Sequence, residues 1–93
     1  MILNWTDQAL ADLASIDAWL NRNASPDVAQ TQLNRIRIRA RSLQDFPRRG
    51  AKFGEDWRVM GVAATPYLLV YRVIDDGVQI LRIRHNREDW HGA

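Results

Sequence analysis

The sequence predicts an α+β fold, in which a two-helix hairpin covers one face of a small antiparallel sheet. Two stretches in the first half of the chain place apolar residues at steps of three and four, which is the spacing of one helix face. The second half holds short runs rich in β-branched and aromatic residues, separated by turn residues. With a short apolar run at residues 2–5, the predicted order is strand, helix, helix, strand, strand, strand.

The first helix is predicted to begin after Thr6, whose hydroxyl can cap it, with Asp7 placed favourably in the first turn. Its apolar stripe runs to about Asn23 and consists of Ala9, Leu13, Ile16 and Leu20. Three acidic residues lie off that stripe, and we expect them to support the helix and its solubility: Asp7, Asp12 and Asp17.

A second helix is predicted to begin at Ser25-Pro26-Asp27, which supplies a capping serine and a proline at the first helical position. Its stripe consists of Ala29, Leu33, Ile36, Ala40 and Leu43. Phe46-Pro47 ends it, because a residue before proline resists the helical conformation. The linker at residues 24–27 is short, so the two helices should be antiparallel neighbours.

The second half is predicted to contain a basic loop at residues 48–56 and then three strands. These cover about residues 57–62, 67–74 and 78–85, with turns at Thr65-Pro66 and Asp75-Asp76-Gly77. A polar tail follows at about residues 86–93. The whole chain, residues 1–93, is predicted to be one domain.

The strand register follows from which residues can be buried. A two-residue loop before the last strand would place Arg82 opposite Tyr71 and bring charge into the core. A three-residue loop with Gly77 in a bulge is therefore preferred, because a one-residue slip moves every side chain to the other face. This register pairs Ile74 with Val78, Arg72 with Ile80, Tyr71 with Leu81, Val70 with Arg82 and Leu69 with Ile83. The face beneath the helices would consist of Leu69, Tyr71, Val73, Leu81 and Ile83.

The opposite sheet face is predicted to collect arginines. Arg72, Arg82 and Arg84 lie on it by register, and Arg58 joins them if Trp57 packs inward with Val59. Such a face suggests an anionic partner, either RNA phosphate or an acidic protein segment. The alternative is an ordinary solvated sheet face, on which arginine needs no further explanation.

Composition excludes several classes of function. The chain has no cysteine, and its two histidines are too few for a zinc site built from protein ligands alone. No apolar run reaches the ~20 residues of a membrane span, and no secretion signal is visible, so we expect a cytoplasmic protein without a membrane partner. No phosphate-binding glycine loop is present, and no cofactor is predicted. Twelve of the 13 basic residues are arginine, a preference that a GC-rich genome would also produce.

From Ile2 to Trp90 the chain resembles the ParE/RelE superfamily of bacterial type II toxins, and is closer to its ParE branch. The run with the highest specificity is Leu81-Arg82-Ile83, followed by His85 and by Asp89-Trp90. The resemblance implies the fold predicted above and a cytoplasmic toxin that a cognate antitoxin neutralises. The disordered half of such an antitoxin wraps the toxin, in a 1:1 or a 2:2 toxin–antitoxin assembly.

Two activities occur in this superfamily: inhibition of DNA gyrase without catalysis, and cleavage of mRNA on the ribosome. For a ribonuclease, the resemblance implies a catalytic set of Arg58, Arg82, Arg84 and His85. No tyrosine follows His85, which favours the gyrase branch or a ribonuclease that works without that group. For either activity the expected binding residues are Arg58, Arg72, Arg82, Arg84, Lys52 and Trp90. A third reading is an inactive relic or a scaffold for the antitoxin.

Overall fold

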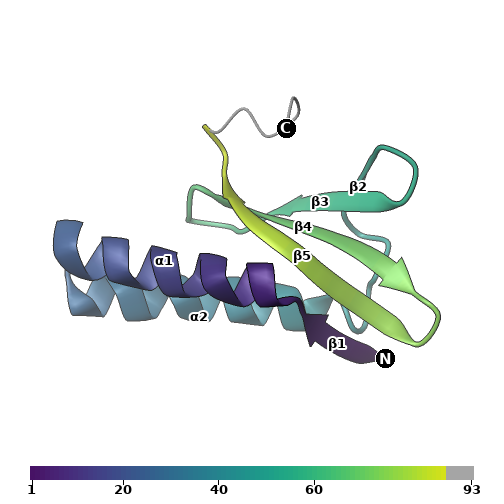
Figure 1. The fold of residues 1–93 in the computed structure, drawn as a ribbon, viewed down its shortest axis with the longest axis horizontal. Helices are drawn as coiled ribbons and strands as arrows, with labels where there is room; N and C mark the ends of the chain where they lie inside the picture. The colour runs from purple at the N-terminus through teal and green to yellow at the C-terminus, as the bar shows by residue number, and fades with distance from the viewer. Residues whose placement is uncertain (88–93) are drawn as a thin grey trace.

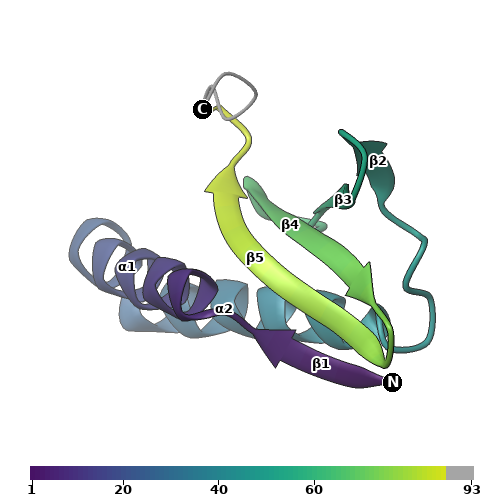
Figure 2. The same cartoon turned by 45° about the vertical axis from the view of Figure 1, so that its right-hand side comes forward.

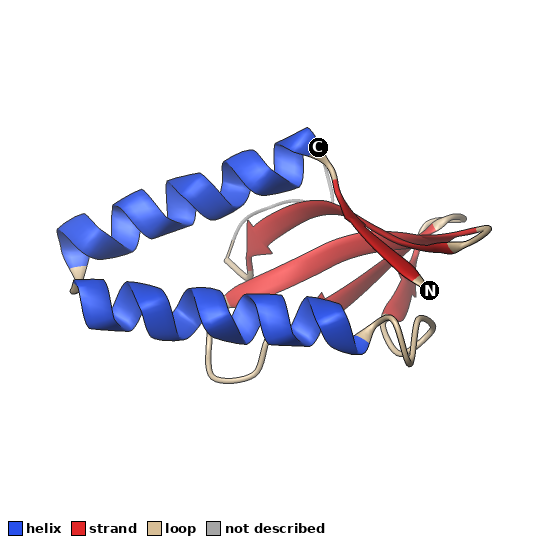
Figure 3. Cartoon of the chain, turned by 90° about the horizontal axis from the view of Figure 1, so that it is seen from below, coloured by secondary structure: helices blue, strands red, loops and turns tan. Residues whose placement is uncertain are grey.

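Two antiparallel helices lie side by side against one face of a five-stranded sheet in the computed structural model, which describes residues 1–87 (Figures 1 and 3). The elements are, in chain order, β1 (Ile2–Trp5), α1 (Asp7–Asn23), α2 (Pro26–Ser42), β2 (Ala51–Phe53), β3 (Trp57–Gly61), β4 (Tyr67–Ile74) and β5 (Gly77–His85). The predicted α+β class, the helical hairpin and the C-terminal meander are confirmed.

Both helices begin where the capping residues predict. The Thr6 hydroxyl accepts a hydrogen bond from the Ala9 amide at 3.1 Å, and the Ser25 hydroxyl accepts one from Val28 at 3.1 Å. Each cap satisfies an amide that the helix itself leaves without a partner, which contributes about 1 kcal/mol. Neither helix of residues 1–87 is long and apolar enough to cross a membrane.

The sheet has the order β1-β5-β4-β3-β2 and is mixed, not purely antiparallel as predicted, because β1 runs parallel to β5 (Figure 2). A second correction concerns residues 51–53, which were predicted as loop and form the edge strand β2 against β3. The parallel pair approaches closely at its start, where Ile2 lies opposite Gly77. A Cβ atom at Gly77 would lie 2.0 Å from the Ile2 carbonyl oxygen, so only glycine fits there.

The core lies between the helical hairpin and the sheet. All nine residues of the two predicted helix stripes are buried except Ile16, which is half-buried and packs against the core. The sheet contributes Leu69, Tyr71 and Ile83, as predicted. Leu81 was predicted in this core and is not part of it, and the fully buried Val78 and Ile80 take its place.

A β-bulge explains this exchange. The pairs Leu69–Ile83 and Val70–Arg82 are as predicted, but nearer the turn Tyr71 pairs with Ile80, and the register shifts between Val70 and Tyr71. The predicted pairs of Arg72 with Ile80 and of Ile74 with Val78 are likewise wrong, since their partners are Gln79 and Gly77. The turn is thus the shorter one, and Leu81 is the extra residue that the bulge absorbs. Arg82 stays out of the core without the longer turn.

Candidate functional site

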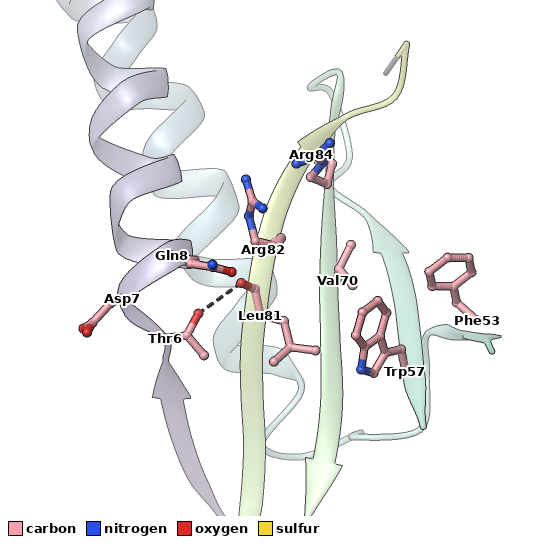
Figure 4. A pocket seen from close by; sticks show the side chains of 9 residues that line it. All are labelled: Thr6, Asp7, Gln8, Phe53, Trp57, Val70, Leu81, Arg82 and Arg84. Carbon is pink, nitrogen blue, oxygen red and sulfur yellow. Dashed lines mark hydrogen bonds between the residues drawn. The ribbon is translucent and has the colours of Figure 1, made fainter. Parts of the chain in front are cut away.

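The open face of the sheet holds a cavity of about 480 Å³, bounded by the start of α1, by β5 and by the β2–β3 hairpin (Figure 4). Its apolar part comes from two aromatic rings 5.9 Å apart and two aliphatic residues: Phe53, Trp57, Val70 and Leu81. Its polar rim consists of Thr6, Asp7, Gln8, Arg82 and Arg84. Trp57 was predicted to pack into the core. It lines this cavity instead, with 46% of its surface exposed.

The first turns of α1 hold the bulged part of β5. Because β1 ends opposite Ile80, β5 has no strand neighbour on that side beyond this point. Thr6 fills the gap by donating its amide to the Ile80 carbonyl at 3.1 Å and its hydroxyl to the Leu81 carbonyl at 3.0 Å. Asp12 continues the contact by accepting the Ile83 amide at 2.9 Å. Three backbone groups on the edge of β5 that β1 leaves unpaired are thereby satisfied.

Arg82 forms a two-point ion pair with Asp12. Its Nε donates to Oδ2 at 2.8 Å and its Nη2 donates to Oδ1 at 3.1 Å. The side chains are 38% and 17% exposed, respectively. Sequence reasoning missed this role of Asp12, although its position beside the buried Leu13 was a usable signal. The pair cancels much of the charge that the predicted arginine face assigned to Arg82.

Arg58 lies on the other face, contrary to the prediction. It is directly opposite Tyr71 across β3 and β4, so it shares the helix side of the sheet with that buried ring. Its Nη1 donates to the carbonyl oxygens of Arg48 and Gly50 at 3.1 and 2.8 Å. The prediction failed because it assumed that Trp57 is buried, and this assumption reversed the alternation along β3.

Tyr71 fixes the same loop. Its hydroxyl donates to the Pro47 carbonyl at 2.9 Å and accepts the Gly50 amide at 2.8 Å. Burial raises the pKa of Tyr71, while the Gly50 hydrogen bond and the charge of Arg58 act in the opposite direction. Arg58 and Tyr71 therefore both stabilise the loop at residues 47–50 through hydrogen bonds to its backbone.

The other expected binding residues are spread out. Arg72 is exposed on the open face and donates its Nε to Gln79 Oε1 at 2.6 Å. Lys52 lies opposite Arg58, in a second cavity of about 490 Å³. Basic and acidic side chains both line that cavity: Arg48, Lys52 and Arg58 with Glu55, Asp56 and Asp75. Trp90 lies outside the described residues.

His85 lines neither of the two cavities described above and belongs to a third one. It pairs with Tyr67 across β4 and β5, and the two rings meet edge to face with centroids 5.8 Å apart. Its Nδ1 accepts the Arg87 amide at 3.1 Å, and burial raises the pKa of Tyr67. The cavity beside this pair, of about 470 Å³, is lined by Ser15, Ile16, Trp19, Leu20, Gln32, Pro66, Tyr67 and His85. None of these lining residues is a lysine or an arginine.

The structure therefore does not bring the predicted catalytic set together. Arg82 and Arg84 share the open-face cavity, whereas Arg58 and His85 lie on the helix side. Their partners on β4, Tyr71 and Tyr67, are four residues apart. At about 3.3 Å per residue this separates Arg58 from His85 by roughly 13 Å along the strand direction. Within residues 1–87 no group of three or more histidine, aspartate or glutamate side chains could hold a metal ion.

Comparison with known proteins gives consistent matches. Residues 3–90 match a family model described as the ParE toxin of type II toxin–antitoxin system, parDE. Two relatives from Caulobacter vibrioides are named Toxin RelE2, 40% identical, and Toxin RelE3, 35% identical. The matches cover 87% of this chain in each case, and 90% and 89% of the relatives. A solved structure described as a chromosomal ParDE TA system from P. aeruginosa has a TM-score of 0.83 and 28% identity. That match covers 91% of this chain and 95% of the other.

Proposed function

Because the chain belongs to the ParE toxin family of type II toxin–antitoxin systems, we propose that it stops bacterial growth by poisoning DNA gyrase, as a binding protein and not as an enzyme. Membership of this family implies a cognate antitoxin as partner. We further propose that the toxin acts in the cytoplasm and that the antitoxin holds it in a 2:2 assembly.

The dispersal of the predicted catalytic groups is the observation that carries this proposal. A general acid, a general base and the cations that stabilise a cleaved phosphate must all reach the same substrate atoms, within about 3 Å for each proton transfer. Arg58 is bound to loop carbonyls, and Arg82 is paired with Asp12. His85 lies among apolar and neutral side chains at the far end of β5.

The composition of the open-face cavity also favours a protein partner. Phe53, Trp57, Val70 and Leu81 supply an apolar surface that the phosphates of RNA could not use. Partly exposed tryptophan and arginine are the residue types enriched at protein–protein interfaces. Asp12 already neutralises Arg82, and Asp7 adds a second negative charge to the residues that line this cavity.

A RelE-type mRNA endoribonuclease is the second candidate. The names of the two Caulobacter relatives favour it, and so does the contact between the rings of Tyr67 and His85. A histidine beside a tyrosine could transfer protons in the cleavage of RNA. Among residues 1–87, however, no lysine or arginine lines the cavity at this pair, so its lining there offers neither of these cations to stabilise the developing charge.

One paired experiment tests the proposal. Purified toxin is added to DNA gyrase with relaxed plasmid and, separately, to translating ribosomes whose mRNA 5′ ends are mapped. We expect loss of supercoiling with intact messages. We expect His85→Ala to leave that inhibition within about twofold, whereas a nuclease that uses His85 would lose about 10²-fold or more. Cuts within translated codons, with gyrase unaffected, would contradict the gyrase proposal and support the ribonuclease.

A further inference from the structure

Arg82 lies at the edge of the open-face cavity (Figure 4), where it forms its ion pair with Asp12. Its two parallel hydrogen bonds fix the plane of the guanidinium as well as its position. The same carboxylate binds the Ile83 amide, which ties the pair to the β5 backbone just after the bulge. The rim arginine is therefore oriented by a residue of α1, 70 positions away in the chain.

The pair also changes the charge of the rim. An isolated arginine beside an apolar pocket attracts phosphate as readily as it attracts a protein oxygen. With Asp12 bound to it, Arg82 presents a nearly neutral pair at the edge of the cavity. An oriented and neutralised arginine beside aromatic side chains suits the carbonyl oxygens and apolar side chains of a protein.

We propose that Asp12 is a specificity-determining residue: it holds Arg82 in a fixed orientation at the edge of the cavity for a protein partner and, by cancelling the charge of Arg82, excludes nucleic acid. That the partner is a protein rests on the proposed function. Whether Asp12 excludes nucleic acid can be measured independently of it. Asp12 acts through Arg82 and is a positioning residue in this sense.

The test compares Asp12→Asn with Asp17→Asn. Both variants remove one negative charge from α1, but Asp17 is exposed and its Oδ1 accepts a hydrogen bond from the neighbouring Asn21 amide. The nucleic-acid probe is a labelled 20-nucleotide single-stranded RNA, with binding followed by fluorescence anisotropy between 50 and 200 mM salt. Inhibition of growth by titrated expression reports on the protein target.

For Asp12→Asn we expect one additional phosphate contact at Arg82. The plot of log K against log salt should then steepen by about 0.7, which is about 2.6-fold in affinity over that salt range. Growth inhibition should weaken roughly tenfold, as for the loss of a well-packed contact at an interface. Asp17→Asn should match the wild type in both measurements. Equal RNA slopes for the two variants would overturn the proposal.

A second variant separates charge from orientation and covers the case in which Asp12→Asn does not fold. Asp12→Glu keeps the charge and displaces the carboxylate by one methylene group. We expect it to weaken growth inhibition while leaving the RNA slope unchanged, and unaltered inhibition would refute the orienting role. If the wild type itself inhibits neither growth nor gyrase, the proposed function fails, while the RNA slopes still decide whether Asp12 excludes nucleic acid.

Discussion

Tyr71→Phe removes a single oxygen atom from a fully buried side chain and should destabilise the protein strongly. The side chain is fully buried, and its hydroxyl is the hydrogen-bond partner of both the Gly50 amide and the Pro47 carbonyl. A buried polar group left without a partner costs about 1–3 kcal/mol. The variant leaves two such groups, the Gly50 amide and the carbonyl of the half-buried Pro47, so the free energy of unfolding should fall by about 2–4 kcal/mol.

That loss is a large part of the 5–15 kcal/mol typical of a folded domain. At about 4–8 °C per kcal/mol for a chain of this size, the melting temperature should fall by roughly 8–32 °C. The assay is thermal and urea unfolding followed by circular dichroism. Tyr67→Phe is the matched control, because the Tyr67 hydroxyl has no hydrogen-bond partner within residues 1–87 although the ring is buried. The reasoning is refuted if both variants lose the same free energy of unfolding.

Three further predictions concern packing and pH. Gly77→Ala should cost about 3 kcal/mol in urea unfolding, because its Cβ would collide with the backbone of β1. Gly61→Ala, whose nearest neighbour would be 3.8 Å away, should be tolerated. Ile36→Ala should cost about 2–5 kcal/mol, since Ile36 is fully buried. Ile38→Ala, at a residue 60% exposed, should change stability by less than about 0.5 kcal/mol, and similar losses would contradict the core described above. Burial raises the pKa of Tyr71 above 10.0, so the folded state keeps its proton to higher pH than the unfolded chain. The stability that protonated Tyr71 contributes is therefore complete below pH 10 and is lost as the pH rises further. Between pH 8 and 11, the urea midpoint of Tyr71→Phe should fall less steeply than that of the wild type.

Much of the fold was determined by the sequence alone, because its signals are local. Thr6 and Ser25 mark the helix starts through contacts with residues three positions away. The helix stripes and the limits of β4 follow from periodicity within one element. The resemblance of the whole chain to its superfamily required no tertiary information. Of the predicted site, Arg82 and Arg84 do share a cavity.

The arrangement of the site was decided only by the tertiary structure. One bulge in β5 moves Leu81 out of the core and admits Val78 and Ile80, and strict alternation along a strand cannot reveal such an extra residue. The ion pair of Asp12 with Arg82 likewise joins residues 70 positions apart.

Arg58 faces the helices because Trp57, its neighbour along β3, faces the open side, and on the helix side Arg58 and Tyr71 bind the same loop. Which face a charged side chain occupies depends on the partners available there, and those partners come from distant parts of the chain. Sequence periodicity therefore predicts the elements, whereas pairing between elements decides what their side chains can bind.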